Sequence, residues 1–478
     1  PDEPKTQPSE EQLAAHQEAL KVIEACHIDT IISESKFLQT ESLLQLAKAL
    51  IRVSGRPQKA GGSFEDEDTS VFCLDLLIAV VLQNRDRILL LWHGVHEHIS
   101  NIVQKASVPS PLVEKAVFGL LRICQRLLPY KEELAEELLR SLQVILKLDA
   151  RVADGLCERI THEVMQLVKA NARHIKSPSG WKTVASLLSI TARHLEASEP
   201  GYETLCFVMF EGAHLTEANY LLFIEAARAF AEASTGGLER SIRSLDLMSE
   251  SVKSLAKWSN ISLTNETSNQ NQEIGEMWLK LAQSQRRLIV DPREDVRNHA
   301  VLSLQRILSG AESMHLSAST LGQVFDHVVF VMLDDLLEIA TKYSPKDYRN
   351  MEKTMLFSMK LVSKVFLQFL DQLSSSPSFP ATWSTLLKHM EKYMKTKLRG
   401  KGSDKLEESI PELLKNMLLV MKTRGVMTQE CELWELTWRN VQGIAPFLKE
   451  ELFPQESANK TEVSTDATSA QEANNVVL

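Results

Sequence analysis

Three histidines and a glutamate fall close together and form the densest group of metal-ligand side chains in the sequence: His93, His96, Glu97 and His98. On a helix, His93 and Glu97 would share one face, and His96 would lie one turn from His93. The His-Glu-x-x-His pattern of zinc proteases would require a histidine at position 100, where this chain has Ser100. We therefore predict a polar helix face here and no metal site.

Motifs for catalysis or cofactor binding do not occur elsewhere in the sequence. There is no Gly-rich phosphate-binding loop and no Gly-x-Ser-x-Gly nucleophile turn. The six cysteines contain no Cys-x-x-Cys pair, which favours reduced core cysteines of a cytosolic protein over a disulfide scaffold or a zinc site. The sequence thus predicts no catalytic residue, no cofactor and no metal ligand.

A basic segment near the C-terminus is the strongest candidate for a binding site. Its seven cations, against Glu391 and Asp404, leave a local charge of +5: Lys388, Lys392, Lys395, Lys397, Arg399, Lys401 and Lys405. Each basic residue near an anionic membrane surface gains about 1 kcal/mol. The segment is therefore a candidate contact for an anionic membrane or an acidic partner. The alternative is a solvated helix end whose cations complement the helix dipole.

Two tryptophans, Trp434 and Trp438, lie four residues apart and would share one helical face. Such a pair can anchor a partner protein. We favour the alternative that it closes the exposed end of a helical-repeat core.

The composition indicates which fold must position these residues. The chain has 478 residues, 44% of them hydrophobic, but only 18 Gly and 16 Pro, which favours helices over a turn-rich β protein. A net charge of −10 argues against nucleic acid as a partner of the chain as a whole. No apolar run is long enough to cross a membrane. Because the chain begins with Pro1, we expect a piece of a longer protein.

The segment Asp291–Leu308 predicts the repeat type, because it resembles the second helix of a HEAT repeat. We expect Asp291 to cap the helix, with Pro292 at the first helical position and Glu294 returning a hydrogen bond to the cap. A stripe of Val296, Ala300, Leu304 and Ile307 should be buried, whereas Arg297 and Asn298 should face away from it. Such a helix needs stacked neighbours, so we predict an all-α fold: an α-solenoid of HEAT-, armadillo- or TPR-like helical repeats.

The expected organisation is two helical blocks joined by a polar linker. We predict a disordered lead-in at residues 1–11, a first block at 12–262, a linker at 263–273, a second block at 274–453 and a disordered tail at 454–478. Within the first block, four consecutive acids, Glu65 to Asp68, should form a solvated loop. Ser110 before Pro111 is typical of a capped helix start.

Long strings throughout the chain resemble one known family. They include ESKFLQTESLLQL (34–46), GLLRICQRLLPYK (119–131), DYRNME (347–352) and SIPELLKNMLLVMK (409–422). These look like the C-terminal third of the GNOM-type ARF guanine-nucleotide exchange factors of plants, and the resemblance extends from about residue 9 to residue 455.

The resemblance implies a role in vesicle-mediated transport. Full-length members of the family activate small ARF GTPases on Golgi and endosomal membranes. Their catalytic exchange domain, whose glutamate displaces the nucleotide, and their N-terminal dimerisation region both lie upstream and are expected to be absent here. An ARF GTPase would therefore be a partner only through that absent domain.

Two functions for this region stay open. The first is a regulatory and membrane-targeting region, cytosolic and peripheral on Golgi or endosomal membranes, that contacts the anionic membrane surface and other domains of the same protein. The second is a structural spacer that stabilises the exchange factor without touching membrane.

Overall fold

The computed structural model describes residues 9–55, 64–189, 195–234, 236–264, 268–342, 347–398, 403–429 and 431–453. The predicted all-α fold is confirmed, because these residues form successive helices and include no β-strand. No helix in the described ranges is long and apolar enough to cross a membrane. The expected disordered tail at 454–478, and residues 1–8 of the expected lead-in, lie outside the described residues.

Packing divides the chain into two compact units, residues 1–254 and 255–478. The helices of the first unit are α1 (Glu10–Ala25), α2 (Ile28–Ser33), α3 (Thr40–Ser54), α4 (Phe64–Gln83), α5 (Ile88–Lys105), α6 (Pro111–Leu127), α7 (Ala135–Ser141), α8 (Ala150–Asn171), α9 (Pro178–Ser189), α10 (Leu195–Met209), α11 (Tyr220–Glu232) and α12 (Gly237–Glu250). Helix α13 (Val252–Thr264) spans the division.

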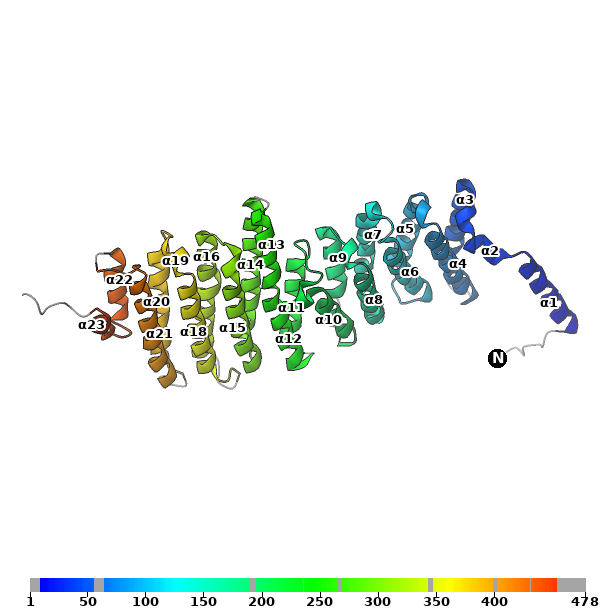
Figure 1. Cartoon of the computed structure of the whole chain (residues 1–478). Helices are drawn as coiled ribbons and strands as arrows, with labels where there is room; N and C mark the ends of the chain where they lie inside the picture. The colour runs from blue at the N-terminus through cyan, green and yellow to red at the C-terminus, as the bar shows by residue number, and fades with distance from the viewer. Residues whose placement is uncertain are drawn as a thin grey trace, which may run out of the picture. The chain divides into compact units, whose positions relative to one another are not determined.

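The first unit is built from two rows of helices. Helices α4, α6, α8 and α10 contact one another in sequence, while α3, α5, α7 and α9 form the other row (Figure 1). In α6, Ser110 Oγ accepts a hydrogen bond from the Val113 amide at 3.4 Å, so the predicted cap is confirmed. A Cβ added at Gly119 would lie 2.2 Å from Ile78 Cδ1. Glycine at this position therefore allows the close packing of α6 on α4.

Ion pairs join neighbouring helices of the α4–α10 row. Lys115 of α6 contacts Asp75 of α4 at 3.1 Å, Arg159 of α8 contacts Glu114 of α6, and Lys169 of α8 contacts Glu203 of α10. Each pair contains one acid and one base from adjacent helices. These pairs therefore link successive helices of the row.

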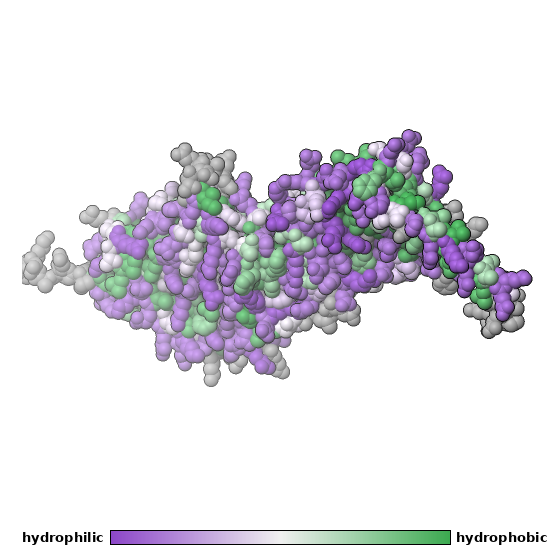
Figure 2. Space-filling view, turned by 45° about the vertical axis from the view of Figure 1, so that its right-hand side comes forward, coloured by the Kyte–Doolittle hydropathy of each residue, from purple (hydrophilic) through white to green (hydrophobic). Residues whose placement is uncertain are grey.

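The surface of the first unit nevertheless keeps several exposed apolar side chains. Phe37 is 74% exposed, Leu89 66% and Phe72 62%. Figure 2 shows hydrophobic surface gathered around the N-terminal helices, beside largely hydrophilic surface. Helix α1 has no buried residue, so it contributes nothing to the core of this unit.

Two expectations at the start of the chain were wrong. The acidic segment Glu65–Asp68 lies in the first turns of α4, where we expected a loop. Acidic residues are favoured near a helix N-terminus by its dipole, which offsets their mutual repulsion. Helix α1 starts at Glu10, inside the expected lead-in, because Ser9 and Gln12 form a reciprocal capping box.

The second unit has the same two-row construction. Its helices are α14 (Ser268–Arg287), α15 (Glu294–Ser309), α16 (Ala318–Val324), α17 (Phe330–Lys342), α18 (Met351–Gln368), α19 (Leu370–Ser374), α20 (Phe379–Lys395), α21 (Asp404–Thr423), α22 (Glu432–Val441) and α23 (Leu448–Leu452). Helices α15, α18 and α21 pack in sequence (Figure 1), and α17, α20 and α22 follow one another in the second row. Stacked helix pairs of this kind are an α-solenoid, as predicted.

The polar run at 263–273 is not simply a linker in this structure. The compact units separate between Ser254 and Leu255, and α14 begins at Ser268. Asn271 is held within the second unit, because its Oδ1 accepts a hydrogen bond from Ser259 Oγ at 2.7 Å. The block bounds 12–262 and 274–453 therefore remain a prediction about domain organisation.

The buried stripe expected in α15 is confirmed, but its predicted cap is wrong. Val296, Ala300, Leu304 and Ile307 are fully buried. The helix begins at Glu294, and Asp291 Oδ1 accepts hydrogen bonds from the backbone amide and Nε of Arg293, both at 2.9 Å. Asp291 thus stabilises the turn before the helix and does not cap the helix itself.

Arg297 and Asn298, expected to face away from the stripe, are buried as well: Arg297 is 0% exposed and Asn298 8%. The Arg297 guanidinium donates to the carbonyl oxygens of Asp291 and Arg349 and to Thr354 Oγ1. Thr354 Oγ1 donates in turn to Asn298 Oδ1 at 2.6 Å. Burial lowers the pKa of Arg297 from its ordinary value, and these acceptors compensate the buried charge. The polar pair therefore joins α15 to α18.

Candidate functional site

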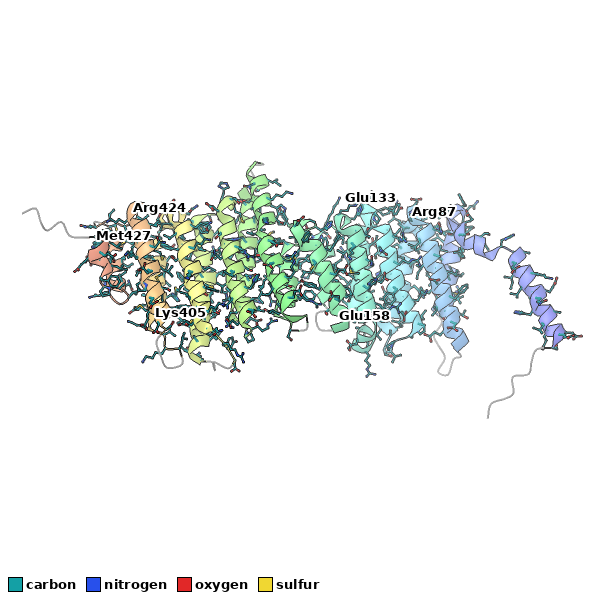
Figure 3. The ribbon with its side chains drawn as sticks, turned by 60° about the horizontal axis from the view of Figure 1, so that its bottom comes forward. Arg87, Glu133, Glu158, Lys405, Arg424 and Met427 are labelled. Carbon is teal, nitrogen blue, oxygen red and sulfur yellow. The ribbon has the colours of Figure 1, made fainter. Side chains whose placement is uncertain are left out.

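The basic segment lies where α20 ends and α21 begins. Lys388, Lys392 and Lys395 are exposed on α20, Lys397 follows it, and Lys405 is exposed in the first turn of α21. Arg399 and Lys401 lie outside the described residues. Figure 3 labels Lys405 near one end of α21 and Arg424 at the opposite end. The five described cations therefore gather at one edge of the second unit.

Neighbouring carboxylates pair with three of these cations. Lys392 Nζ lies 3.9 Å from Asp334 Oδ1, and Lys405 Nζ lies 3.7 Å from Glu352 Oε2. Lys395 pairs with Glu391 one turn earlier. Among the described residues, Lys388 and Lys397 have no ion-pair partner. The edge is thus less positive than the +5 of its sequence indicates.

Buried polar contacts hold α20 against α17. His389 Nε2 lies 3.1 Å from Asp334 Oδ1, and its ring stacks on Phe330 with centroids 5.3 Å apart. Tyr393 Oη donates to the carbonyl of Leu333 at 2.9 Å, and burial raises the pKa of Tyr393 well above its ordinary value. These buried groups fix the helix, so its exposed lysines have a defined position.

Sequence reasoning missed the carboxylates of Asp334 and Glu352. Both are distant from the basic segment in the sequence and reach it only through the packing of α17 and α18 against their neighbours. A local charge count includes only neighbours along the chain. The signal that could have found Asp334 is the acidic pair Asp334–Asp335 on α17, one repeat earlier.

The histidines of α5 point to different partners. His93 is exposed, His96 stacks on Trp92 with centroids 5.6 Å apart, and His98 is buried with its Nε2 2.8 Å from Ser54 Oγ. Burial lowers the pKa of both His96 and His98. Among the described residues, no group of three or more His, Cys, Asp or Glu side chains could hold a metal ion.

The two tryptophans pack together at the end of the second unit. The rings of Trp434 and Trp438 meet edge to face at 5.5 Å, and Phe453 contacts both, with centroid distances of 4.8 and 5.9 Å. Trp438 is 8% exposed. The two tryptophans therefore contact an aromatic residue of the same chain. This supports our interpretation that they close the end of the repeat core rather than anchor a partner protein.

Comparisons with known proteins support the resemblance found in the sequence. The chain is 60% identical over 96% of its length to the ARF guanine-nucleotide exchange factor GNOM of Arabidopsis thaliana. It is 51% identical to GNL1 of the same plant, again over 96% of its length. A family model described as "GBF1-like, tetratrico peptide repeat region" matches residues 278–448. The resemblance to a GNOM-type exchange factor is thus confirmed.

The chain spans about a third of the length of the curated relatives it matches: 32% of GNOM, 32% of GNL1 and 33% of a more distant relative. That relative is the Golgi-specific brefeldin A-resistance guanine nucleotide exchange factor 1 homolog of Caenorhabditis elegans, 22% identical over 94% of this chain. Among solved structures, a circular tandem repeat protein matches 86% of this chain and 92% of its own, with a TM-score of 0.33 and 13% identity.

Proposed function

We propose that this chain is the helical-repeat region of a larger ARF guanine-nucleotide exchange factor of the GNOM type. The observation that carries the proposal is the 60% identity to GNOM over 96% of the chain. The substrate of the whole protein would be a small ARF GTPase, which this region would not itself activate. No catalytic motif occurs in the sequence, and the two units consist of stacked helix pairs whose usual use is to bind macromolecules.

The finer proposal is that this region targets the exchange factor to anionic Golgi or endosomal membranes. The support is the edge formed by α20 and α21, where Lys388 and Lys397 have no carboxylate partner in the described part of the chain. A few unpaired cations give weak attraction that salt screens within about 8 Å at physiological ionic strength. We therefore expect weak, salt-sensitive membrane contact.

Sedimentation with liposomes tests this contact. The Lys388→Glu/Lys397→Glu variant should lose binding to vesicles that contain phosphatidylserine, because it reverses the two unpaired charges. A matched control is Lys360→Glu/Lys364→Glu, which changes the net charge equally at two exposed positions of α18. Equal loss in both variants would mean that net charge, and not this edge, controls binding.

The second candidate is the structural spacer. The observation that favours it is the pairing of Lys392, Lys395 and Lys405 with Asp334, Glu391 and Glu352, which is typical of a surface that neutralises itself. If the intact chain does not sediment with anionic vesicles even at low salt, the spacer is the better description. That result would not affect the proposal that this chain is part of a GNOM-type ARF exchange factor.

A nucleotide-release assay tests the assignment of activity. The chain alone should not accelerate release of a fluorescent guanine nucleotide from an ARF GTPase, whereas a full-length GNOM-type exchange factor should. Clear acceleration by the chain alone would show that residues of this region take part in exchange.

A further inference from the structure

A groove of about 790 Å³ opens in the first unit where α3 and α5 end and α6 begins. It lies at the opposite end of α5 from Arg87, which Figure 3 labels beside the start of that helix. Half-buried apolar side chains line its wall: Ile51, Ile102 and Leu112. A volume of this size lies within the range of ligand pockets in proteins.

Helix packing brings two distant cations to this groove. Arg52 is in the last turn of α3 and Lys105 in the last turn of α5, and both line the groove. The two helices belong to the same row and end at the same edge of the unit. Both side chains are exposed, and neither makes an ion pair with any described residue. Unlike Lys115, Arg159 and Lys169, which pair with carboxylates of neighbouring helices, they remain available to a ligand.

The lining contains no acidic side chain among the described residues, although the chain as a whole carries −10. The groove also lies beside the first turn of α6, whose dipole adds positive potential. An anionic group is therefore the complementary ligand. The apolar wall requires that this group be attached to apolar atoms, which excludes a free inorganic ion as the preferred occupant.

The floor of the groove is neutral and fixed. His98 is 7% exposed, and its Nε2 lies 2.8 Å from Ser54 Oγ. Ser54 Oγ also lies 2.7 Å from the Leu50 carbonyl, to which it donates, so His98 Nε2 donates to Ser54 and the imidazole presents Nδ1 as an acceptor. A Cβ on Gly55 would lie 3.1 Å from His98 Cε1, so glycine leaves room for the ring. The exposed Asn101 amide, which also lines the groove, can both donate to and accept from a peptide backbone.

We propose that this groove binds a short acidic peptide of a partner protein, with apolar side chains against Ile51, Ile102 and Leu112 and carboxylates paired with Arg52 and Lys105. The proposal is independent of membrane contact at the α20–α21 edge, which belongs to the other unit. It assigns a protein-binding role to the first unit.

Peptide selection on the intact chain tests the proposal. A random short-peptide phage library should be enriched in sequences that combine Asp or Glu with Leu, Ile or Phe. The strongest acidic peptide, labelled with fluorescein, should bind the Arg52→Glu/Lys105→Glu variant at least about tenfold more weakly in fluorescence polarisation. Each exposed ion pair is worth up to about a fivefold change in affinity, and the reversed charges add repulsion. Raised salt should weaken binding to the unaltered chain.

The matched control is Lys48→Glu/Lys147→Glu, which reverses two exposed cations of the same unit outside the groove. It should bind the peptide as the unaltered chain does. Far-UV spectra should show that both variants keep their helices, because all four side chains are exposed.

Three results would overturn the proposal. The first is a selection without acidic peptides, and the second is equal affinity of the peptide for the groove variant and the control. The third uses vesicles of phosphatidylserine and phosphatidylcholine. If the Arg52→Glu/Lys105→Glu variant lost vesicle binding but still bound the peptide as the unaltered chain does, Arg52 and Lys105 would be contacts for lipid.

Discussion

Arg297 shows how a single buried residue can join two repeats. Its guanidinium donates to backbone carbonyls of the turns before α15 and before α18 and to the Thr354 hydroxyl. The sequence places Arg297 next to the apolar stripe, and charge alone predicts that it faces solvent. Two of its acceptors, at residues 349 and 354, come from α18 and the turn before it, and no local pattern in the sequence of α15 reveals them.

Replacing Arg297 with Met should lower the free energy of unfolding of the second unit by about 2 to 4 kcal/mol, because buried carbonyls left without a donor cost roughly 1 to 3 kcal/mol each. Arg297→Lys should be intermediate, since an ammonium keeps the charge but reaches fewer of the acceptors. Urea denaturation followed by circular dichroism measures both. If Arg297→Met were as stable as the unaltered chain, the network would contribute specificity of packing and no stability.

His98 should make the first unit less stable in acid. Burial lowers its pKa in the folded state below the ordinary value of about 6.5, so the unfolded chain binds the proton more tightly. The contribution of neutral His98 to the free energy of unfolding is therefore complete above the pKa that His98 has in the unfolded chain. It is lost as the pH falls from that value toward the lower pKa of the folded state. His96 acts in the same direction, so His98→Gln should reduce the slope of stability against pH without abolishing it.

The matched control for this measurement is His93→Gln, which alters an exposed histidine of the same helix. Thermal unfolding between pH 7.5 and pH 5.5, where an ordinary histidine titrates, gives the slope for each variant. An unchanged slope in His98→Gln would mean that other groups control the acid sensitivity.

At the scale of the helix, periodicity predicted what is buried more reliably than where a helix begins. The α15 stripe and the Ser110 cap of α6 follow from local spacing and residue type, and both were confirmed. The start of α4 was mistaken because consecutive acids resemble a loop, although a helix N-terminus accepts them. The charge of the α20–α21 edge was overestimated because Asp334 and Glu352 come from other helices.

Leu304→Ala should destabilise the second unit by about 2 to 5 kcal/mol, because Leu304 is fully buried in α15 and its truncation leaves a cavity. The same helix offers a control in Leu302, which is 43% exposed. Leu302→Ala should change stability by less than about 0.5 kcal/mol. Similar costs for the two variants, measured by urea denaturation, would contradict the burial of the stripe.

At the scale of the whole molecule, contacts are mainly between neighbouring helices, and packing separates two units at Ser254 and Leu255. Stability in such a fold approximates a sum over repeats and their nearest-neighbour interfaces. We expect unfolding that is not two-state. Hydrogen exchange read by mass spectrometry should give different opening free energies for α6–α8 and α18–α20. A single common value throughout the chain would show that the units unfold together.

The ion pairs between α4, α6, α8 and α10 carry an evolutionary consequence. Each of these three pairs joins two adjacent helices of the row, so its charges match across one helix–helix interface. A gene that duplicates or deletes a whole helix pair then has to restore matching charges only at the new junction. Such a row can change its length by descent while most of its side-chain pairing is inherited unchanged.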